Sequence, residues 1–191
     1  MILPIVSYGH PMLRKVCVDI DKDYPGLQQL IDDMFETMYA ASGVGLAAPQ
    51  VNKGIRLFII DATPYAEDFP GETNLKKVFI NPHIIEQEGE EWSFNEGCLS
   101  IPDIREDVIR KTDLRIQYYD ENFNFHDEKL NGVFARVIQH EYDHLEGILF
   151  VDRISSLRKI MLKRKLSEIA KGLVDTSYKM LFPATRKKAI S

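Results

Sequence analysis

The sequence predicts an α+β fold whose sheet is mostly antiparallel. Segments rich in β-branched and aromatic residues are grouped in the middle of the chain, whereas helical patterns lie near its two ends. Chains that form parallel sheets alternate strands with helices, and this order does not. The 191 residues suit a single domain, residues 1–191, because no internal repeat or linker divides them.

The first predicted element is an amphipathic helix over residues 25–41. Pro25 suits its first turn, and Gly43 is expected to end it. Its apolar residues recur at the spacing of one helical face. They are Leu27, Leu30, Ile31, Met34, Phe35, Met38 and Tyr39.

Three strands are predicted over residues 55–61, 77–87 and 113–120, which are rich in β-branched and aromatic side chains. Between the first two, residues 63–75 contain the run P-Y-A-E-D-F-P-G-E-T-N and predict a surface loop. Pro82 cannot donate a ladder hydrogen bond, so the second strand is expected to lie at an edge or to bend there.

Two more helices are predicted in the C-terminal third. One runs from about Gly132 to Glu146, with Gly147 just past its end. The other begins at Ser155, and its apolar side is expected to carry Leu157, Ile160, Met161 and Ile169.

Charge is unevenly distributed along the chain. Residues 155–191 carry ten Lys or Arg against two Asp or Glu, a net charge of +8. Because the whole chain has a net charge of −5, the preceding residues carry −13. A basic segment of this kind is either a solvated helix with a frayed end or a contact for a polyanion such as RNA. Residues 172–191 are predicted to be a mobile basic tail of the catalytic domain.

The sequence favours a cytoplasmic protein. Its first residues lack the basic start of a signal peptide, and Pro4 interrupts a short apolar run. No stretch approaches the roughly 18 apolar residues that span a bilayer. Cys17 and Cys98 cannot build a disulfide framework, so at least one is free for packing or chemistry.

The chemistry is indicated by Q-H-E-Y-D-H-L-E-G, residues 139–147, which contains H-E-x-x-H. On a helix, residues four apart share a face, so His140 and His144 can present their imidazoles to one ion. Glu141 lies beside the first ligand, within reach of a water at the ion. The alternative is an exposed helix with two satisfied histidines, but both continue an apolar row with Val133 and Val137, and buried imidazoles need partners.

Catalytic sites of this type use three protein ligands and leave one position for water. The histidine of the longer protease pattern H-E-x-x-H-x-x-G-x-x-H falls on Phe150, which cannot bind a metal. A later glutamate is available only as Glu168, within a segment rich in Lys and Arg. Cys98, in N-E-G-C-L-S-I-P, is the better third ligand: taken alone it is more often a small core residue than a ligand, but its pairing with the helix motif reverses this.

Residues 43–50, G-V-G-L-A-A-P-Q, form a loop of small residues. Its glycines and alanines allow other groups to approach the backbone, and Gln50 offers an amide donor at its end. By itself the segment could be a plain connection from helix to strand. A phosphate-binding loop is disfavoured because no Lys-Ser/Thr pair follows.

Two other classes of protein remain as alternatives. A metallopeptidase that cleaves internal bonds needs a carboxylate as its third ligand. A structural metal-binding module without turnover needs a fourth protein ligand, for which His83 and His126 are the candidates. Neither histidine has ligand-like spacing.

The three motifs together resemble those of peptide deformylases. The family is marked by G-x-G-L-A-A-x-Q, E-G-C-L-S and Q-H-E-x-D-H-L, which stand here without departure at residues 43–50, 96–100 and 139–145. The resemblance implies antiparallel sheets packed around a central metal-binding helix, with an N-terminal and a C-terminal helix. It also implies hydrolysis of the N-formyl group from the initiator formyl-methionine of newly made polypeptides, releasing formate.

By matching position, the resemblance assigns Cys98, His140 and His144 as ligands of one divalent metal ion. In the family this ion is typically Fe²⁺, with Zn²⁺, Ni²⁺ or Co²⁺ able to replace it. Glu141 is implied to be the general acid and base. Gln50 and the backbone N–H of Leu99 are implied to stabilise the oxyanion.

The substrate implied by the resemblance is an N-formyl-methionyl nascent polypeptide, which needs an apolar slot beside the metal. We expect Val44, Val133 and Val137 to line it and the Gly45 backbone to bond the peptide. One hypothesis for the basic C-terminal segment is docking on the ribosome. Neither a membrane nor DNA is expected as a partner.

Overall fold

The computed structural model describes residues 1–68 and 75–183 of the chain. Its centre is a five-stranded antiparallel sheet in the order β2-β3-β4-β5-β6. The strands are β2 (Gly45–Ala47), β3 (Leu57–Asp61), β4 (Lys76–Cys98), β5 (Ile101–Tyr119) and β6 (Phe125–Asn131). The predicted α+β class is confirmed.

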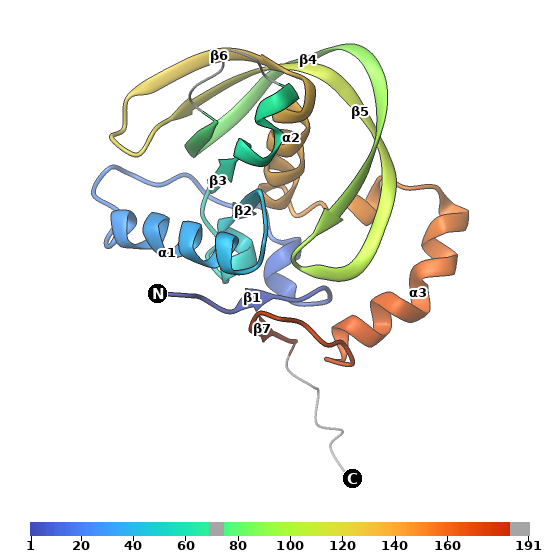
Figure 1. Cartoon of the computed structure of the whole chain (residues 1–191). Coiled ribbons are helices and arrows are strands. Elements are labelled where there is room, and N and C mark those ends of the chain that lie inside the picture. The colour runs from blue at the N-terminus through green and yellow to red at the C-terminus, as the bar shows by residue number, and fades with distance from the viewer. Residues whose placement is uncertain (69–74, 184–191) are drawn as a thin grey trace.

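The long β4–β5 hairpin curls around α2 (Gly132–Leu145), so that this helix lies at the centre of the molecule (Figure 1). β2 and β3 lie on the other side of α2 in the same view. The inward face of the helix is apolar, and its residues Phe134, Ala135 and Ile138 are buried in the core with Phe58 and Phe79 of the sheet. The helix is therefore held by hydrophobic packing on several sides.

Both strands of the hairpin are longer than the sequence predicted. β4 continues past residue 87 to Cys98, and β5 begins at Ile101 rather than at residue 113. The pairing with β3 ends at Ile80, and the register with β5 shifts between Ile80 and His83. Pro82 therefore lies at a bend, which was one of its two expected positions.

Two helix ends have the same left-handed termination. α1 (Leu27–Ala40) ends with Ser42 at a φ of 57°, and the N–H of Gly43 donates to the Met38 carbonyl. α2 ends at Gly147, whose φ is 70°, and Ile148 donates to the carbonyl of Asp143. The predicted stop at Gly147 is confirmed, whereas α1 turns one residue before Gly43.

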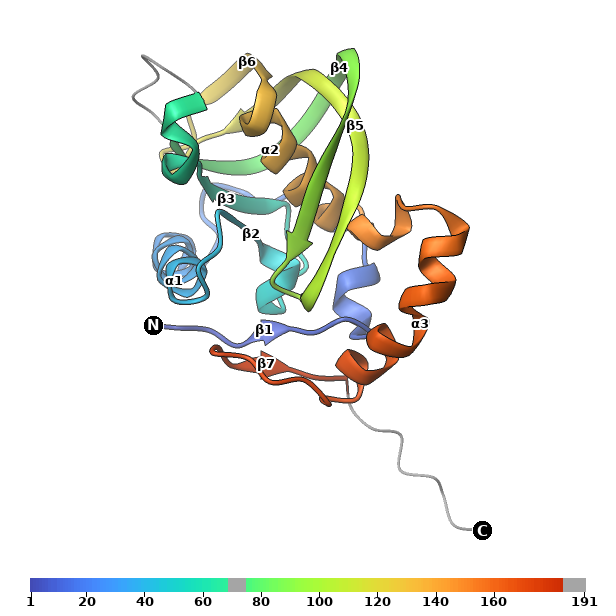
Figure 2. The same cartoon turned by 45° about the vertical axis from the view of Figure 1, so that its right-hand side comes forward.

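α3 (Ser156–Ala170) lies at the edge of the molecule, on the outer side of β5 (Figure 2). Ser155 accepts from the N–H of Arg158, so the predicted start is confirmed. The predicted apolar side is wrong in part. Leu157, Ile160 and Met161 are exposed, and the buried positions are Leu166 and Ile169, because only the second half of the helix packs on the body.

After α3 the chain returns beneath the molecule. Residues 172–183 form an arm that carries β7 (Met180–Leu181), and β7 pairs in parallel with β1 (Ile5–Val6). The remaining part of the predicted tail, residues 184–191, lies outside the described residues, as do 69–74 of the predicted loop. Short 3-10 helices cover Pro11–Arg14, Ala48–Val51, Thr63–Asp68 and Phe150–Asp152.

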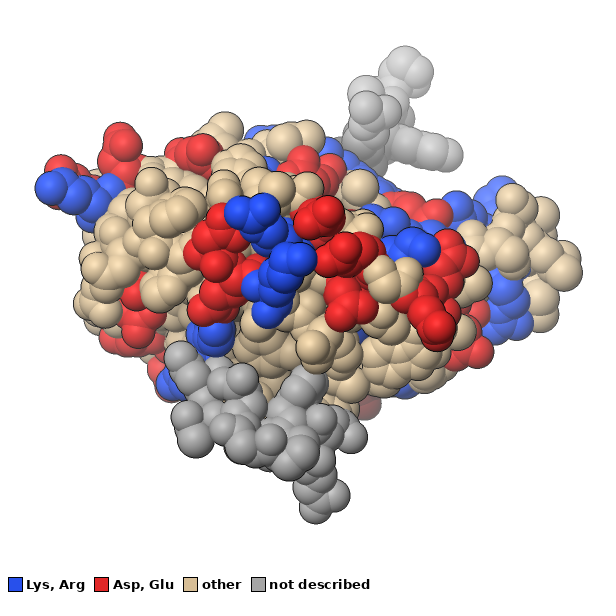
Figure 3. Space-filling model, turned by 90° about the horizontal axis from the view of Figure 1, so that it is seen from above, with Lys and Arg blue, Asp and Glu red and all other residues tan. Residues whose placement is uncertain are grey.

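The surface above the hairpins mixes both signs of charge. Figure 3 shows acidic and basic side chains interspersed on this face. Cross-strand ion pairs such as Arg115 with Asp127 and Lys129 with Glu88 occupy the β4–β6 surface. Among the described residues, no helix is both long and apolar enough to cross a bilayer.

Gly147, just past the end of α2, has no room for a side chain. A Cβ at Gly147 would lie 2.8 Å from the backbone carbonyl of Arg14, whereas one at Gly26, with nearly the same φ of 71°, would meet nothing within 4 Å. We expect Gly147→Ala to lower the free energy of unfolding by roughly 2–4 kcal/mol, from left-handed strain and overpacking together. Gly26→Ala should cost only the strain, about 1–2 kcal/mol.

Chemical denaturation of the two variants beside the parent measures this difference. Equal losses of stability would contradict the close approach of Arg14 to the helix end.

Candidate metal centre

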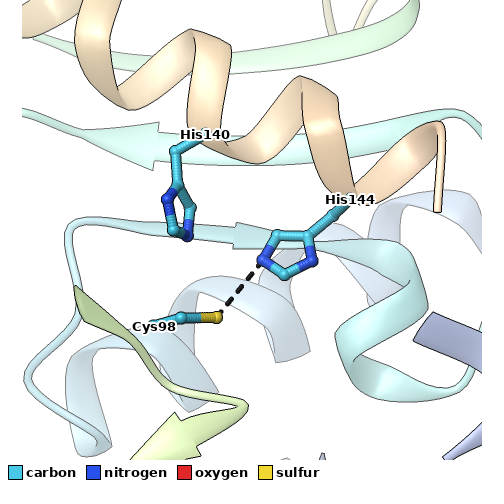
Figure 4. Close-up of side chains that lie close together, drawn as sticks. All are labelled: Cys98, His140 and His144. Atoms are coloured by element: carbon cyan, nitrogen blue, oxygen red, sulfur yellow. Dashed lines mark hydrogen bonds between the residues drawn. The ribbon is translucent and has the colours of Figure 1, made fainter. Parts of the chain in front are cut away.

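Three side chains from two distant segments converge in the interior. Cys98 ends β4, and His140 and His144 project from α2 toward it (Figure 4). One ligand atom from each lies within 4.8 Å of the other two, and Cys98 Sγ is 3.3 Å from His144 Nε2. Within the described residues this is the only such group of His, Cys, Asp and Glu.

Local sequence explains how each element presents its ligand. The two histidines are four residues apart on α2, so their rings lie 5.2 Å apart on one face. Cys98 pairs with Ile101 at the close of the hairpin, which leaves residues 99 and 100 as a tight turn beneath the helix. Gly97 keeps space for Arg105, whose Nη1 would lie 2.8 Å from a Cβ there.

Glu96 connects the two elements and was not among the residues predicted from the sequence. Its carboxylate accepts from His140 Nδ1 at 2.9 Å, from Arg110 Nε at 2.7 Å and from Arg136 Nη1 at 3.0 Å. Burial opposes the charged form, but the hydrogen bonds from His140 and Arg110 outweigh it and hold the pKa of Glu96 well below its usual range. The bond to Nδ1 leaves Nε2 of His140 for a metal.

Asp143 extends this network to the end of α2. It accepts from Arg110 Nη1 at 2.7 Å and from Arg153 Nε at 2.6 Å. Asp143, Glu96 and Arg110 are all nearly inaccessible to solvent. The buried charges are thus compensated, as a stable fold requires.

The sequence held weak signals for these residues. Glu96 is part of E-G-C-L-S, and Asp143 is part of the helix motif. Nothing local identified Arg110 or Arg136, because their partners lie 14 and 40 residues away from them in the chain, on β4.

The pKa values of the two histidines are shifted in opposite directions. Burial lowers the pKa of His144 well below its ordinary value, and the nearby charge of His140 adds to this. Burial acts the same way on His140, but the hydrogen bonds that its imidazole donates to Cys98 and Glu96 prevail and raise the pKa of His140 well above its ordinary value.

The donor set fits a divalent ion of borderline softness. One sulfur and two imidazoles suit Fe²⁺ or Zn²⁺, and three protein ligands are the number found in catalytic sites. One buried polar atom that faces the site, Glu141 Oε2, has no hydrogen-bond partner in the described part of the chain. Such an atom marks a polar interior that is incomplete without a further group.

Glu141 follows His140 on α2. Its carboxylate lies against residues 43–50, the glycine loop. A Cβ on Gly45 would lie 2.5 Å from Glu141 Oε1, so only glycine leaves room for this carboxylate. Burial raises the pKa of Glu141 to about 7. A carboxyl group with this pKa exchanges protons near neutral pH.

Gln50 reaches the site from the other end of the glycine loop. Its Oε1 accepts from the N–H of Ala47 at 2.8 Å, which fixes the amide. Its Nε2 is directed at Cys98 Sγ, 3.5 Å away, and at Ser100 Oγ, 3.2 Å away. The amide donor therefore lies beside the cysteine rather than in solvent.

A cleft of about 540 Å³ opens onto this centre. The structure brings Val44, Gly45 and Val137 to its wall, together with Gln50, Leu99 and Glu141. It does not bring Val133 there. Val133 lies two turns before His140, where its side chain packs into the core under the sheet.

The residues required by the alternative functions lie elsewhere. His126 bonds Asp120 at 2.9 Å, and His83 is 3.8 Å from Asp19. Glu168 pairs with Arg164 on α3. None of the three belongs to the group around Cys98.

Comparisons with known proteins assign the chain to a family. The family model described as polypeptide deformylase matches residues 2–160. The peptide deformylases of Christiangramia forsetii and Flavobacterium psychrophilum are 56% and 55% identical to this chain. The alignments cover 98% of this chain and 99% of the first relative, and 97% of this chain and 100% of the second.

Solved structures agree with this family relationship. A crystal structure of a peptide deformylase from Legionella pneumophila superimposes with a TM-score of 0.78 at 36% identity, covering 91% of this chain and 98% of that one. A peptide deformylase from Plasmodium falciparum gives 0.79 at 36% identity over 88% of this chain and 95% of that one.

The role of Glu96 in holding His140 can be tested with Glu96→Gln. Loss of the charge weakens the hold on the imidazole, so we expect metal affinity to fall roughly 10- to 100-fold. Two buried arginines also lose their counter-charge, which should lower the free energy of unfolding by about 3–5 kcal/mol. Competition with a chelator, under conditions where the variant is folded, measures the affinity.

Glu128→Gln is the matched control, because Glu128 pairs with Lys77 on β4, and that pair contacts none of the ligands. Metal affinity that is the same in both variants would show that Glu96 does not orient the ligand.

Proposed function

Because the chain belongs to the peptide deformylase family, we propose that Cys98, His140 and His144 hold its metal ion and that Glu141 moves the protons of the reaction. The family activity is hydrolysis of the N-formyl group from the initiator formyl-methionine of new polypeptides, which releases formate. The family depends on a metal, and the observation that carries the assignment is the approach of the three ligand atoms to within 4.8 Å.

Held by Cys98, His140 and His144, a divalent ion would supply acidification of a water and attraction for negative charge on a nearby oxygen. Glu141 is the base that takes a proton from the attacking water as its oxygen joins the formyl carbon. The C–N bond then breaks, and Glu141 returns a proton to the departing amine. The pKa of about 7 at this buried carboxyl suits both transfers.

Negative charge develops on the formyl oxygen during the attack. Gln50 Nε2 and the backbone N–H of Leu99 are the donors proposed to receive it. The amide of Gln50 is held in advance by its bond to Ala47, so it needs no reorganisation during the reaction. Preorganised donors of this kind lower the barrier most effectively.

The methionine side chain is proposed to bind in the cleft against Val44 and Val137, with the Gly45 backbone bonding the peptide. Apolar contacts discriminate by only about 1–3 kcal/mol per methylene, so similar side chains should be tolerated. Val133 supports this wall from the core rather than contacting substrate.

The native ion is proposed to be Fe²⁺, with Zn²⁺, Ni²⁺ or Co²⁺ able to occupy the site. A thiolate with two imidazoles accepts any of these ions. We further propose that residues 1–191 act as one catalytic domain in the cytoplasm, where new polypeptides begin.

We also propose a contact between the basic C-terminal segment and ribosomal RNA, because the substrate polypeptide emerges from the ribosome. Lys163 and Arg164 of α3 are exposed, and residues 155–191 carry a net charge of +8. Basic side chains that neutralise phosphates produce binding that weakens steeply with salt.

Removal of residues 184–191 tests this contact while keeping β7. We expect weaker co-sedimentation with ribosomes and a log–log salt dependence that is shallower by up to about 3, from Arg186, Lys187 and Lys188. A binding strength and salt dependence equal to those of the full chain would count against the contact.

Substitutions separate the metal ligands from the proton carrier. Glu141→Ala should keep its metal but lose nearly all turnover, whereas Cys98→Ala should lose metal and turnover together. Gln50→Ala should keep metal and lower kcat by roughly a hundredfold or more. Formate release from formyl-Met-Ala-Ser and metal content are the measurements.

If Glu141→Ala stays active on this peptide, the proposed mechanism is wrong. Cleavage of unformylated peptides at internal bonds would instead support a metallopeptidase.

A further inference from the structure

The C-terminal arm reaches the cleft that opens onto the metal centre. Residues 175–178 line the cleft beside Leu99 and Cys98. The arm is anchored next to them, since Ile5 N–H donates to the Lys179 carbonyl at 2.8 Å and Ser7 N–H donates to the Leu181 carbonyl at 2.9 Å. This arm lies beyond residues 2–160, the part matched by the family model.

One side chain of the arm touches the turn that bears the oxyanion donor. The hydroxyl of Tyr178 donates to the Leu99 carbonyl at 2.8 Å, although the two residues are 79 positions apart. The side chains of Tyr178 and Leu99 pack against the same core cluster near α1. The hydroxyl is thus fixed by packing, and Thr176 Oγ1, which donates to the Tyr178 carbonyl at 2.7 Å, holds its backbone.

The turn at residues 98–100 has few other restraints on Leu99. Tyr8 N–H donates to the Ser100 carbonyl at 2.8 Å, and Gln50 bonds the Ser100 hydroxyl. Both contacts act on Ser100. Within the described residues, the Tyr178 hydroxyl is the one side-chain donor to the backbone of Leu99.

We propose that Tyr178 is a positioning residue for deformylation, which holds the Leu99 carbonyl so that the N–H of Leu99 faces the formyl oxygen. This inference rests on the proposed function of the site. The orientation of a backbone N–H depends on the torsions of its residue, and a restraint on the following peptide limits them. Small displacements of a catalytic donor are costly, since about 1 Å can reduce a rate a hundredfold.

Tyr178→Phe removes only the hydroxyl and tests the proposal. We expect kcat on formyl-Met-Ala-Ser to fall about tenfold, less than for outright loss of an oxyanion donor. KM should stay within about twofold and metal content should be unchanged, because the substrate wall and the ligands are intact. A merely structural role would instead lower thermal stability and leave kcat of the folded enzyme unaltered.

Tyr118→Phe is the matched control. It also removes a buried tyrosine hydroxyl bond, to Glu128 at 3.1 Å, but on β5 and away from the cleft. We expect it to keep the parent kcat at a comparable change in stability.

The proposal is overturned if Tyr178→Phe keeps kcat within twofold of the parent, or if its loss of rate follows loss of metal. It is also overturned if Tyr118→Phe loses as much. Should Tyr178→Phe not fold, Thr176→Val decides, because it loosens the arm and leaves the hydroxyl present. A lower kcat with metal retained supports positioning, and an unchanged kcat contradicts it.

The parent enzyme and Glu141→Ala, assayed in the same series, separate this question from the proposed function. If the parent releases no formate, the function itself fails. If the parent is active, Glu141→Ala is inactive and Tyr178→Phe matches the parent, only the role of Tyr178 fails.

Discussion

The rest of the site depends on the hydrogen bonds that the buried Glu96 carboxylate accepts. Glu96 lies on β4 two residues before Cys98, and it bonds His140 of α2 as well as Arg110 and Arg136. One buried anion therefore sets where the cysteine strand meets the histidine helix. Burying such a charge is unfavourable unless every partner is present, so the network allows one arrangement and disfavours shifted ones.

The rest of the fold supplies space and direction around that junction. Glycine at position 45 lets the Glu141 carboxylate lie against the loop, and the bond from Ala47 turns the Gln50 amide toward Cys98. The hairpin turn brings the Leu99 backbone beneath the helix, and the C-terminal arm contacts it from outside. The groups proposed to transfer protons and to stabilise charge are thus held in place before substrate arrives.

Local patterns in the sequence predicted the parts that local physics determines. The spacing of His140 and His144 placed both on one helical face, and Gly147 marked the end of that helix correctly. The motif segments predicted which residues would meet, because the resemblance to a known family covers all three. Val133 shows the limit of periodicity, since a residue on the same stripe packs into the core instead of the cleft.

The parts that the sequence could not predict depend on distant partners. Arg110 occupies an inward position on β5, where alternation calls for an apolar side chain, and only Glu96 and Asp143 explain it. The pairing of β7 with β1 joins opposite ends of the chain through two residues each, too short for a strand pattern. The apolar stripe of α3 predicted burial, but Leu157, Ile160 and Met161 are exposed, and the first half of the helix contacts the body through the ion pair of Arg158 with Glu106.

X-ray absorption spectroscopy of the anaerobically purified protein tests whether Cys98, His140 and His144 hold one ion together. We expect one ion per chain with one sulfur at about 2.3 Å, two imidazole nitrogens at about 2.0–2.1 Å and at least one further light atom from solvent, with distances as for Zn²⁺. A first shell without sulfur, or one closed by a fourth protein ligand, would contradict this assignment.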